Sequence, residues 1–212
     1  STLRVAEACI EADASLIAIS STSVYGTQKD QVDENCSDSE LQPQSPYATT
    51  KLKEEELIAN LSKDKGLKAI HCRFGTIFGA SQGMRFHTAV NKFCWQAVMN
   101  QPISVWTTAY DQKRPYLDLL DASRAIAFII KNNIFDGQIY NVLTSNATVR
   151  QVVDTIKEFV PNLEIEFVDN QIMNQLSYEV LCQRFKSKGF VFSGNMRRGI
   201  KETIDLLKYA NK

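Results

Sequence analysis

The chain has 212 residues, of which 44% are hydrophobic and 23% are charged, so it can bury the core of an ordinary globular protein. Lys plus Arg and Asp plus Glu each number 24, and the resulting zero net charge excludes a bulk attraction to nucleic acid or to an anionic membrane. No apolar run approaches the roughly 20 residues of a membrane span, and no signal peptide is recognisable. We therefore expect a cytoplasmic protein with no nucleic-acid or membrane partner.

The cysteines and histidines do not indicate a metal site. No two cysteines form a CxxC pair, and scattered cysteines in a chain of this length are typical of reduced, mostly buried thiols. Only His71 and His87 could join them as ligands, and no HExxH pattern occurs. The five cysteines are Cys9, Cys36, Cys72, Cys94 and Cys182.

The hydrophobic periodicity predicts helices and strands in alternation. In chain order we expect a helix over 1–12, a strand over 14–21, a helix over 46–61, a strand over 67–72, a helix over 88–99, strands over 103–106 and 114–119, a helix over 122–130, a strand over 138–142, a helix over 148–159, a strand over 163–168 and a helix over 196–209. Ser45 and Pro46 are predicted to begin the second helix, and Asp121 to cap the fourth. Polar residues 28–42 and glycine-containing residues 73–85 are expected as loops. This order predicts an α/β chain with a mainly parallel sheet.

A tyrosine with a lysine four positions later occurs twice. In the first pair, Gly26 and a polar run follow Tyr25, which favours a turn in which Tyr25 and Lys29 need not be neighbours. In the second pair, Tyr47 and Lys51 share one face of the predicted helix. An ammonium near a phenol stabilises the phenolate, so such a tyrosine can accept a proton from an alcohol near neutral pH. Serine and threonine hydroxyls at residues 20–23 follow a predicted strand, and the carboxyl ends of parallel strands are where ligands bind.

These segments resemble the extended short-chain dehydrogenase/reductases of the NAD-dependent epimerase/dehydratase type, through SSTSVYG at residues 20–26 and SPYATTK at residues 45–51. The resemblance implies that Ser21 is the catalytic hydroxyl and Tyr47 the general acid/base. It implies that Lys51 binds the nicotinamide ribose and supports Tyr47. It continues along the chain in residues 73–79, 114–121, 138–142 and 148–149.

The resemblance also implies binding residues. NAD is expected as the cofactor, and the residues expected to contact it are Ser20, Tyr47, Lys51, Phe74 and Gly75. The expected substrate is a nucleotide-sugar, with contacts from Thr22, Ser23, Thr76, Arg85 and Arg114. Arg114 matches an arginine that contacts the diphosphate, and Arg85, which follows a glycine-containing loop, either meets a substrate anion or is an ordinary surface residue. Arg73 is interpreted as structural.

Three departures from the family pattern shape the interpretation. Relatives that eliminate water commonly carry two acidic residues where this chain has Thr22 and Ser23, so an epimerase or a simple dehydrogenase is favoured over a dehydratase. Thr76 stands where relatives often have asparagine. No glycine-rich loop precedes Ser20, and about 90 residues of a dinucleotide-binding half are therefore expected to be missing.

The expected architecture is the C-terminal part of a Rossmann-type parallel sheet with a smaller α/β substrate-binding lobe. Residues 1–72 are assigned to the Rossmann-type domain and residues 73–212 mostly to the lobe, with about 114–142 returning to the sheet. The favoured function is a nucleotide-sugar epimerase, with NAD binding by these 212 residues alone weak or absent, and a homodimer is expected from the resemblance. The alternatives are an NAD(P)-dependent sugar dehydrogenase, reductase or dehydratase, and a non-catalytic nucleotide-sugar-binding remnant.

Overall fold

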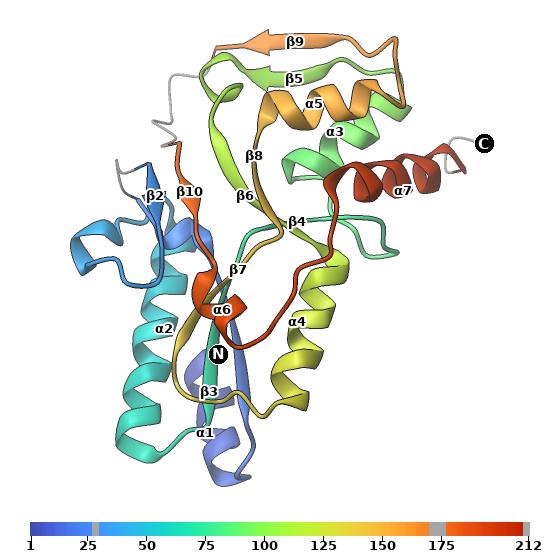
Figure 1. The fold of residues 1–212 in the computed structure, drawn as a ribbon. Coiled ribbons are helices and arrows are strands. Elements are labelled where there is room, and N and C mark those ends of the chain that lie inside the picture. The colour runs from blue at the N-terminus through green and yellow to red at the C-terminus, as the bar shows by residue number, and fades with distance from the viewer. Residues whose placement is uncertain (27–29, 170–176, 210–212) are drawn as a thin grey trace.

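The computed structural model describes residues 1–26, 30–169 and 177–209, which form two packed parts (Figure 1). The first part is built on a three-stranded parallel sheet in the order β1-β3-β7. Its strands are β1 (Leu16–Ser21), β3 (Ala69–Phe74) and β7 (Ile139–Val142). Ser21 lies opposite Phe74 in the register, so the carboxyl ends of β1 and β3 coincide.

Helices cover both faces of this sheet, because successive strand residues point to opposite sides. Ala18 and Ala69 face the helices α1 and α2, whereas Ile17, Ile70 and Cys72 face α4 and the aromatic side chains near it. The three helices are α1 (Thr2–Glu11), α2 (Pro46–Lys65) and α4 (Leu119–Lys131). The central strand β3 is buried along its whole length, whereas the edge strand β1 is partly exposed, with Ile19 39% exposed.

The second part is a mixed α/β lobe. In it, β4 pairs in parallel with β6, β6 pairs in antiparallel fashion with β8, and β5 pairs in parallel with β9. The strands are β4 (Thr76–Phe78), β5 (Ile103–Trp106), β6 (Lys113–Asp118), β8 (Ser145–Thr148) and β9 (Ile165–Val168). The helices α3 (Ala89–Val98), α5 (Val149–Lys157) and α7 (Met196–Lys208) enclose a core that includes Phe78, Val90, Val152 and Ile200.

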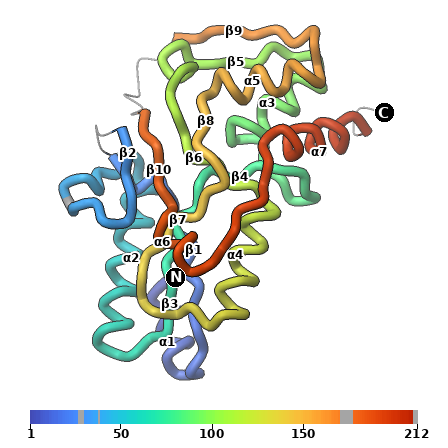
Figure 2. Tube along the Cα trace, in the orientation of Figure 1, coloured from blue at the N-terminus to red at the C-terminus, as the bar shows by residue number. Residues whose placement is uncertain are grey.

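The chain crosses between the two parts more than once. After the lobe, the C-terminal segment returns to the first part through a short strand, passes beside β7, and then re-enters the lobe as α7 (Figure 2). The remaining short elements are η1 (Thr22–Val24), β2 (Gln31–Val32), η2 (Asp38–Glu40), η3 (Thr107–Ala109), β10 (Glu179–Val180) and α6 (Gln183–Ser187). Strands β2 and β10 pair in parallel, which places residues 148 positions apart side by side.

The predicted α/β class with parallel strands is confirmed, and most predicted elements are present. Three local predictions are wrong. The strand expected over 67–72 lies two residues later, and the loop expected over 73–85 contains β4. The polar stretch 28–42 contains β2 and η2, while Lys29 of the alternative tyrosine–lysine pair lies outside the described residues.

The capping residue of α4 is also corrected. Asp118, rather than Asp121, accepts the capping hydrogen bond, from the backbone N–H of Leu120 at 2.9 Å. The Asp121 carboxylate lies in the first helical turn and instead accepts hydrogen bonds from the backbone N–H groups of Ser193 and Gly194.

Within the described ranges, no helix combines the length and the apolar character that crossing a membrane would demand.

Candidate functional site

A cavity of about 790 Å³ opens at the carboxyl ends of β1 and β3. This is the edge of a parallel sheet at which ligands bind in α/β proteins. It collects eight of the residues singled out from the sequence: Ser20, Ser21, Ser23, Tyr47, Phe74, Gly75, Thr76 and Arg85. Lys51, Thr22 and Arg114 do not border it.

Ser21 is the last residue of β1 and at the same time the N-cap of η1. Its Oγ accepts a hydrogen bond from the backbone N–H of Ser23 at 3.1 Å. The Ser23 hydroxyl donates a second hydrogen bond to the same Oγ at 2.9 Å. Both side chains border the cavity, so two hydroxyls stand together at the strand end.

Thr22 lies between these serines but points away from the cavity. Its side chain is buried, and its hydroxyl donates to the Phe74 carbonyl at the end of β3, at 3.3 Å. The buried Tyr178 hydroxyl donates to the carbonyl of Thr22 at 3.3 Å and to that of Tyr25 at 3.4 Å. These contacts tie the turn to β3 and to the C-terminal segment.

Tyr47 is placed by the start of α2. Ser45 caps the helix by accepting from the backbone N–H of Ala48 at 3.1 Å, and Pro46 occupies the first turn, as predicted. Tyr47 therefore lies in the first turn of α2 beside the cavity, and 57% of its surface is exposed. Lys51 follows one turn later, and its Nζ lies 6.0 Å from the centre of the Tyr47 ring.

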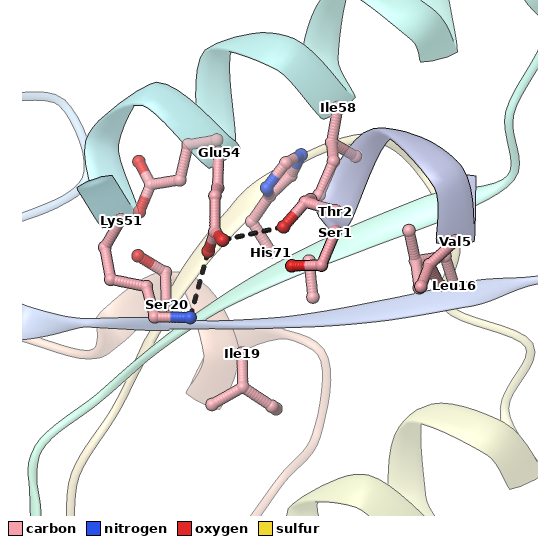
Figure 3. A pocket seen from close by; sticks show the side chains of 12 residues that line it. Ser1, Thr2, Val5, Leu16, Ile19, Ser20, Lys51, Glu54, Ile58 and His71 are labelled. Carbon is pink, nitrogen blue, oxygen red and sulfur yellow. Dashed lines mark hydrogen bonds and ion pairs between the residues drawn. The ribbon is translucent and has the colours of Figure 1, made fainter. Parts of the chain in front are cut away.

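The nearest partner of the Lys51 ammonium is Glu54 rather than Tyr47. The Lys51 Nζ lies 3.0 Å from Glu54 Oε2, and the Thr2 hydroxyl donates to Glu54 Oε1 at 2.7 Å. Dashed lines mark both contacts in Figure 3. The Thr2 hydroxyl, and after it Lys51, lower the pKa of Glu54. Sequence spacing alone did not identify Glu54 as a partner.

Lys51 and Glu54 line a smaller cavity of about 300 Å³ on the side of the sheet covered by α1 and α2 (Figure 3). Ser20 borders both cavities and so lies between them. In the described part of the chain, Ser20 Oγ and His71 Nε2 are buried without a hydrogen-bond partner. Burial lowers the pKa of His71.

A buried ion pair anchors α2 to the sheet. Arg73 Nε donates to Glu55 Oε1 at 3.0 Å and Arg73 Nη2 to Oε2 at 2.6 Å, with side chains only 1% and 5% exposed. The Arg73 guanidinium lies 4.9 Å from the centre of the Tyr25 ring, and the Tyr25 hydroxyl donates to Asn141 Oδ1 at 2.9 Å. Burial raises the pKa of Tyr25 to about 12. The structural interpretation of Arg73 thus agrees with its contacts.

Arg85 lies on the wall of the cavity formed by the loop after β4. Asn91, which is 5% exposed, joins the two ends of this loop. Its Oδ1 accepts from the backbone N–H of Gly79, and its Nδ2 donates to the carbonyl of Arg85, both at 3.3 Å. No sequence pattern points to Asn91, because its hydrogen-bond partners are brought to it by the fold.

Arg114 belongs to a different environment. It lies on β6, donates to Gln112 Oε1 at 3.1 Å, and its guanidinium is 5.9 Å from the centre of the Tyr178 ring. Burial lowers the pKa of Arg114. Since Tyr178 also contacts the turn after β1, Arg114 is linked to the site through that ring.

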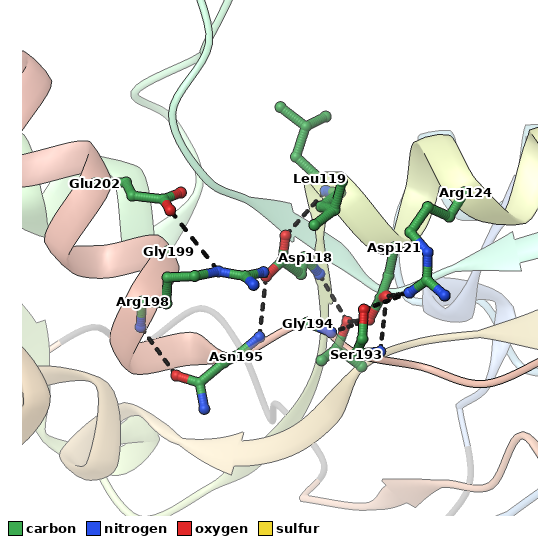
Figure 4. Close-up of polar contacts among 12 residues, drawn as sticks. Asp118, Leu119, Asp121, Arg124, Ser193, Gly194, Asn195, Arg198, Gly199 and Glu202 are labelled. Atoms are coloured by element: carbon green, nitrogen blue, oxygen red, sulfur yellow. Dashed lines mark hydrogen bonds and ion pairs between the residues drawn. The ribbon is translucent and has the colours of Figure 1, made fainter.

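Two carboxylates at the start of α4 hold the segment that leads into α7 (Figure 4). Asp121, which has no exposed surface, accepts hydrogen bonds of 2.8 to 3.0 Å from Ser193 N, Gly194 N, Thr144 Oγ1 and Arg124 Nη1. Asp118 accepts from Asn195 N and Arg198 Nη2, both at 3.0 Å. In the described ranges, no group of three or more His, Cys, Asp or Glu side chains is arranged to hold a metal ion.

Comparisons with known proteins identify the family to which the chain belongs. Residues 1–142 match the model of the NAD dependent epimerase/dehydratase family. A trifunctional UDP-glucose 4,6-dehydratase/UDP-4-keto-6-deoxy-D-glucose 3,5-epimerase/UDP-4-keto-L-rhamnose-reductase of Arabidopsis thaliana is 28% identical over 196 residues, covering 89% of this chain and 28% of that protein. An uncharacterized UDP-glucose epimerase, YtcB, of Bacillus subtilis is 30% identical over 159 residues, covering 73% of this chain and 48% of that protein.

Solved structures share the fold. The NAD complex of UDP-glucuronic acid 4-epimerase from Bacillus cereus superposes with a TM-score of 0.87 at 19% identity, covering 100% of this chain and 67% of that one. UDP-glucose 4-epimerase from Thermotoga maritima superposes with a TM-score of 0.85 at 18% identity, covering 100% of this chain and 69% of that one. The chain spans less than half the length of the two curated relatives above.

Proposed function

The chain belongs to the NAD-dependent epimerase/dehydratase family, and we propose that the protein containing it is a nucleotide-sugar epimerase. In this proposal a sugar hydroxyl is oxidised transiently and the hydride returns to the opposite face of the ring. The observation that carries it is the meeting of Ser21 and Tyr47 at one cavity at the carboxyl end of the sheet. Thr22 and Ser23 offer no carboxyl group there, which favours epimerisation over loss of water.

The residues present fit the nicotinamide-ribose end of NAD. Ser20 Oγ is buried without a hydrogen-bond partner in the described part of the chain and borders both cavities, so a polar ligand there could satisfy it. Phe74 and Gly75 border the larger cavity and Lys51 the smaller one, and we assign these residues to the same end of the cofactor. When bound, NAD⁺ supplies the acceptor and donor of the hydride.

No glycine-rich phosphate loop occurs in the sequence, and such loops provide the backbone N–H groups that bind a dinucleotide pyrophosphate. We therefore expect these 212 residues on their own to bind NAD weakly. Titration calorimetry on this chain checks the expectation, and tight binding would contradict it.

The chain's own residues handle the proton. Tyr47 accepts the proton of the sugar hydroxyl as the carbinol carbon loses its hydride. It returns that proton after the keto sugar has rotated to present its opposite face. Ser21 hydrogen-bonds the oxygen that becomes the carbonyl. Lys51, whose Nζ lies 6.0 Å from the centre of the Tyr47 ring, supports the Tyr47 phenolate through its charge. The substrate loses and regains one hydride and one proton, so the cofactor is not consumed.

The rest of the cavity is assigned to the nucleotide-sugar. Thr76 and Ser23 border the space beside the reacting groups, and Arg85 supplies a positive charge on the wall formed by the loop after β4. Arg114 does not border this cavity, so its expected contact with the diphosphate is kept only as part of the proposal. Thr22 is assigned to the turn rather than to the substrate, since its hydroxyl is bonded to the Phe74 carbonyl.

Tyr47→Phe in the complete protein tests the proposal. We expect turnover of the nucleotide-sugar substrate to be abolished while its binding, measured by calorimetry, stays nearly unchanged, because the substitution removes the phenolic hydroxyl that transfers the proton and keeps the ring. Tyr209→Phe, at a tyrosine that is 76% exposed, is the matched control and should remain active. Product stereochemistry, read by NMR over a panel of nucleotide-sugars, reports the reaction, and unchanged activity of Tyr47→Phe would remove the central claim.

Two other outcomes select the alternatives. Net formation of NADH, with no epimeric product, would assign the same residues to a sugar dehydrogenase. Binding of nucleotide-sugars without turnover in the complete protein would favour a non-catalytic binding protein. The homodimer expected from the family resemblance is tested separately by light scattering.

A further inference from the structure

The Ser21 hydroxyl has both of its acceptor positions occupied within its own turn. A serine hydroxyl can donate one hydrogen bond and accept two. Ser21 Oγ accepts from the Ser23 backbone N–H at 3.1 Å and from the Ser23 hydroxyl at 2.9 Å. The proton of Ser21 remains available for a further acceptor, and Ser21 borders the cavity where the substrate oxygen is proposed to sit.

We propose that Ser23 is a positioning residue that makes Ser21 a donor toward the substrate oxygen. This inference rests on the proposed function of the same site and deepens it. Both lone pairs of Ser21 are held by Ser23, so Ser21 cannot accept the proton of the sugar hydroxyl and can only donate its own. Tyr47 is then left as the acceptor of the substrate proton.

This division of roles has a chemical consequence. A donor directed at the sugar oxygen stabilises the carbonyl and the negative charge that develops as the hydride leaves, more than it stabilises the starting alcohol. Ser21 keeps its proton throughout, and the proton released by the substrate goes to Tyr47. Without the Ser23 hydroxyl, Ser21 could rotate and accept from the substrate instead, which would stabilise the ground state.

The turn is rigid enough for such an arrangement. The Thr22 hydroxyl is bonded to the Phe74 carbonyl, and the Tyr178 hydroxyl holds the carbonyls of Thr22 and Tyr25. Beyond the turn, the backbone N–H of Gly26 donates to a carbonyl in η2 at 3.2 Å. The two serines are therefore aligned before any substrate binds, and preorganised donors of this kind need no rearrangement during the reaction.

The experiment compares Ser23→Ala and Ser23→Thr in the complete protein supplied with NAD and its nucleotide-sugar. We expect Ser23→Ala to lower kcat about tenfold, the effect of one lost orienting hydrogen bond, with the Kd of the nucleotide-sugar within about twofold. Ser23→Thr retains the hydroxyl and should recover most of the rate. Ser123→Ala, at an exposed serine on α4, is the matched control for the substitution.

A double-variant cycle separates positioning from direct substrate contact. If Ser23 acts through Ser21, Ser23→Ala should have little further effect on kcat in a Ser21→Ala background. Multiplicative losses, or a raised Kd with unchanged kcat, would overturn the inference and assign Ser23 to direct binding. A Ser23→Ala protein as fast as the unmodified one would also overturn it.

These failures differ from failure of the proposed function. If the complete protein turns over no nucleotide-sugar, or if Tyr47→Phe is fully active, the function and the role of Ser23 both fall. If the protein is active, Tyr47→Phe is inactive and Ser23→Ala is unimpaired, only the role of Ser23 is lost. Thermal melting by circular dichroism establishes that each variant is folded.

Discussion

Removing the Glu55 carboxylate should destabilise the protein severely, because it leaves the Arg73 guanidinium buried without its counter-ion. The two side chains are 5% and 1% exposed, and Arg73 donates to both carboxylate oxygens. Breaking a buried pair by removing one partner costs about 3–5 kcal/mol. The free energy of unfolding of a typical globular domain is about 5–15 kcal/mol. Glu55→Leu should therefore remove a large part of the total stability.

Urea unfolding followed by circular dichroism measures this cost. The matched control is Glu158→Leu, because Glu158 pairs with Arg197 at the same 2.6 Å but with side chains 48% and 63% exposed. An exposed pair of that kind contributes at most about 1 kcal/mol. Both variants thus remove a carboxylate that lies 2.6 Å from a guanidinium, but only the Glu55 pair is buried and bonded through both carboxylate oxygens.

The double variant Glu55→Leu with Arg73→Met identifies the source of the cost. Replacing both members of a buried pair by apolar residues of similar size is often close to neutral, so the double variant should be more stable than Glu55→Leu alone. If it is as unstable as the sum of the two single variants, lost packing rather than the unpaired charge is responsible. Equal costs at Glu55 and Glu158 would refute the argument from burial.

Two further outcomes are expected from the same measurements. Gly194→Ala should cost about 1–3 kcal/mol, because the added Cβ would lie 2.4 Å from Asp118 Cβ and 2.5 Å from Asp121 Oδ2, whereas Gly83→Ala, with no atom within 4 Å, should be near neutral. An unchanged unfolding midpoint for Gly194→Ala would contradict the close packing of that segment. The lowered pKa of His71 means that the unfolded state binds more protons, so stability should fall as the pH drops below about 6.5, by up to about 1.4 kcal/mol per pH unit. His71→Gln should lack this component between pH 7.5 and 5.5, and an identical pH dependence in both proteins would show that another group is responsible.

The parts of the fold that follow from local chemistry were predictable from the sequence. The start of α2 is an example, since Ser45 and Pro46 carry the signals for a helix beginning and are found in those positions. The strand over 14–21 is another, because a short apolar run ending in hydroxylated residues is typical of a buried parallel strand. Both elements contribute residues to the cavity, so the sequence could predict that the side chains at their ends lie near one another.

The parts that depend on distant residues were not predictable in this way. Asp121 was expected to cap α4, but its partners Ser193 and Gly194 lie more than 70 positions away and cannot be inferred from periodicity. The same reason applies to Asn91, whose amide joins Gly79 to Arg85 across a loop. The sequence identifies the chemistry of these polar groups, and the fold decides which backbone groups they satisfy.

The three consecutive residues after Ser20 illustrate why a motif needs its contacts to be interpreted. Ser21, Thr22 and Ser23 have nearly the same chemistry, and all three were expected near the reaction. In the structure Thr22 is turned inward onto the Phe74 carbonyl, which leaves Ser21 and Ser23 on the cavity side and within hydrogen-bond distance of each other. The buried threonine lies between the two serines in sequence, and its contact with the end of β3 holds the turn in which Ser21 and Ser23 meet. The inward hydroxyl therefore contributes to the arrangement of the site through the end of β3, without bordering the cavity itself.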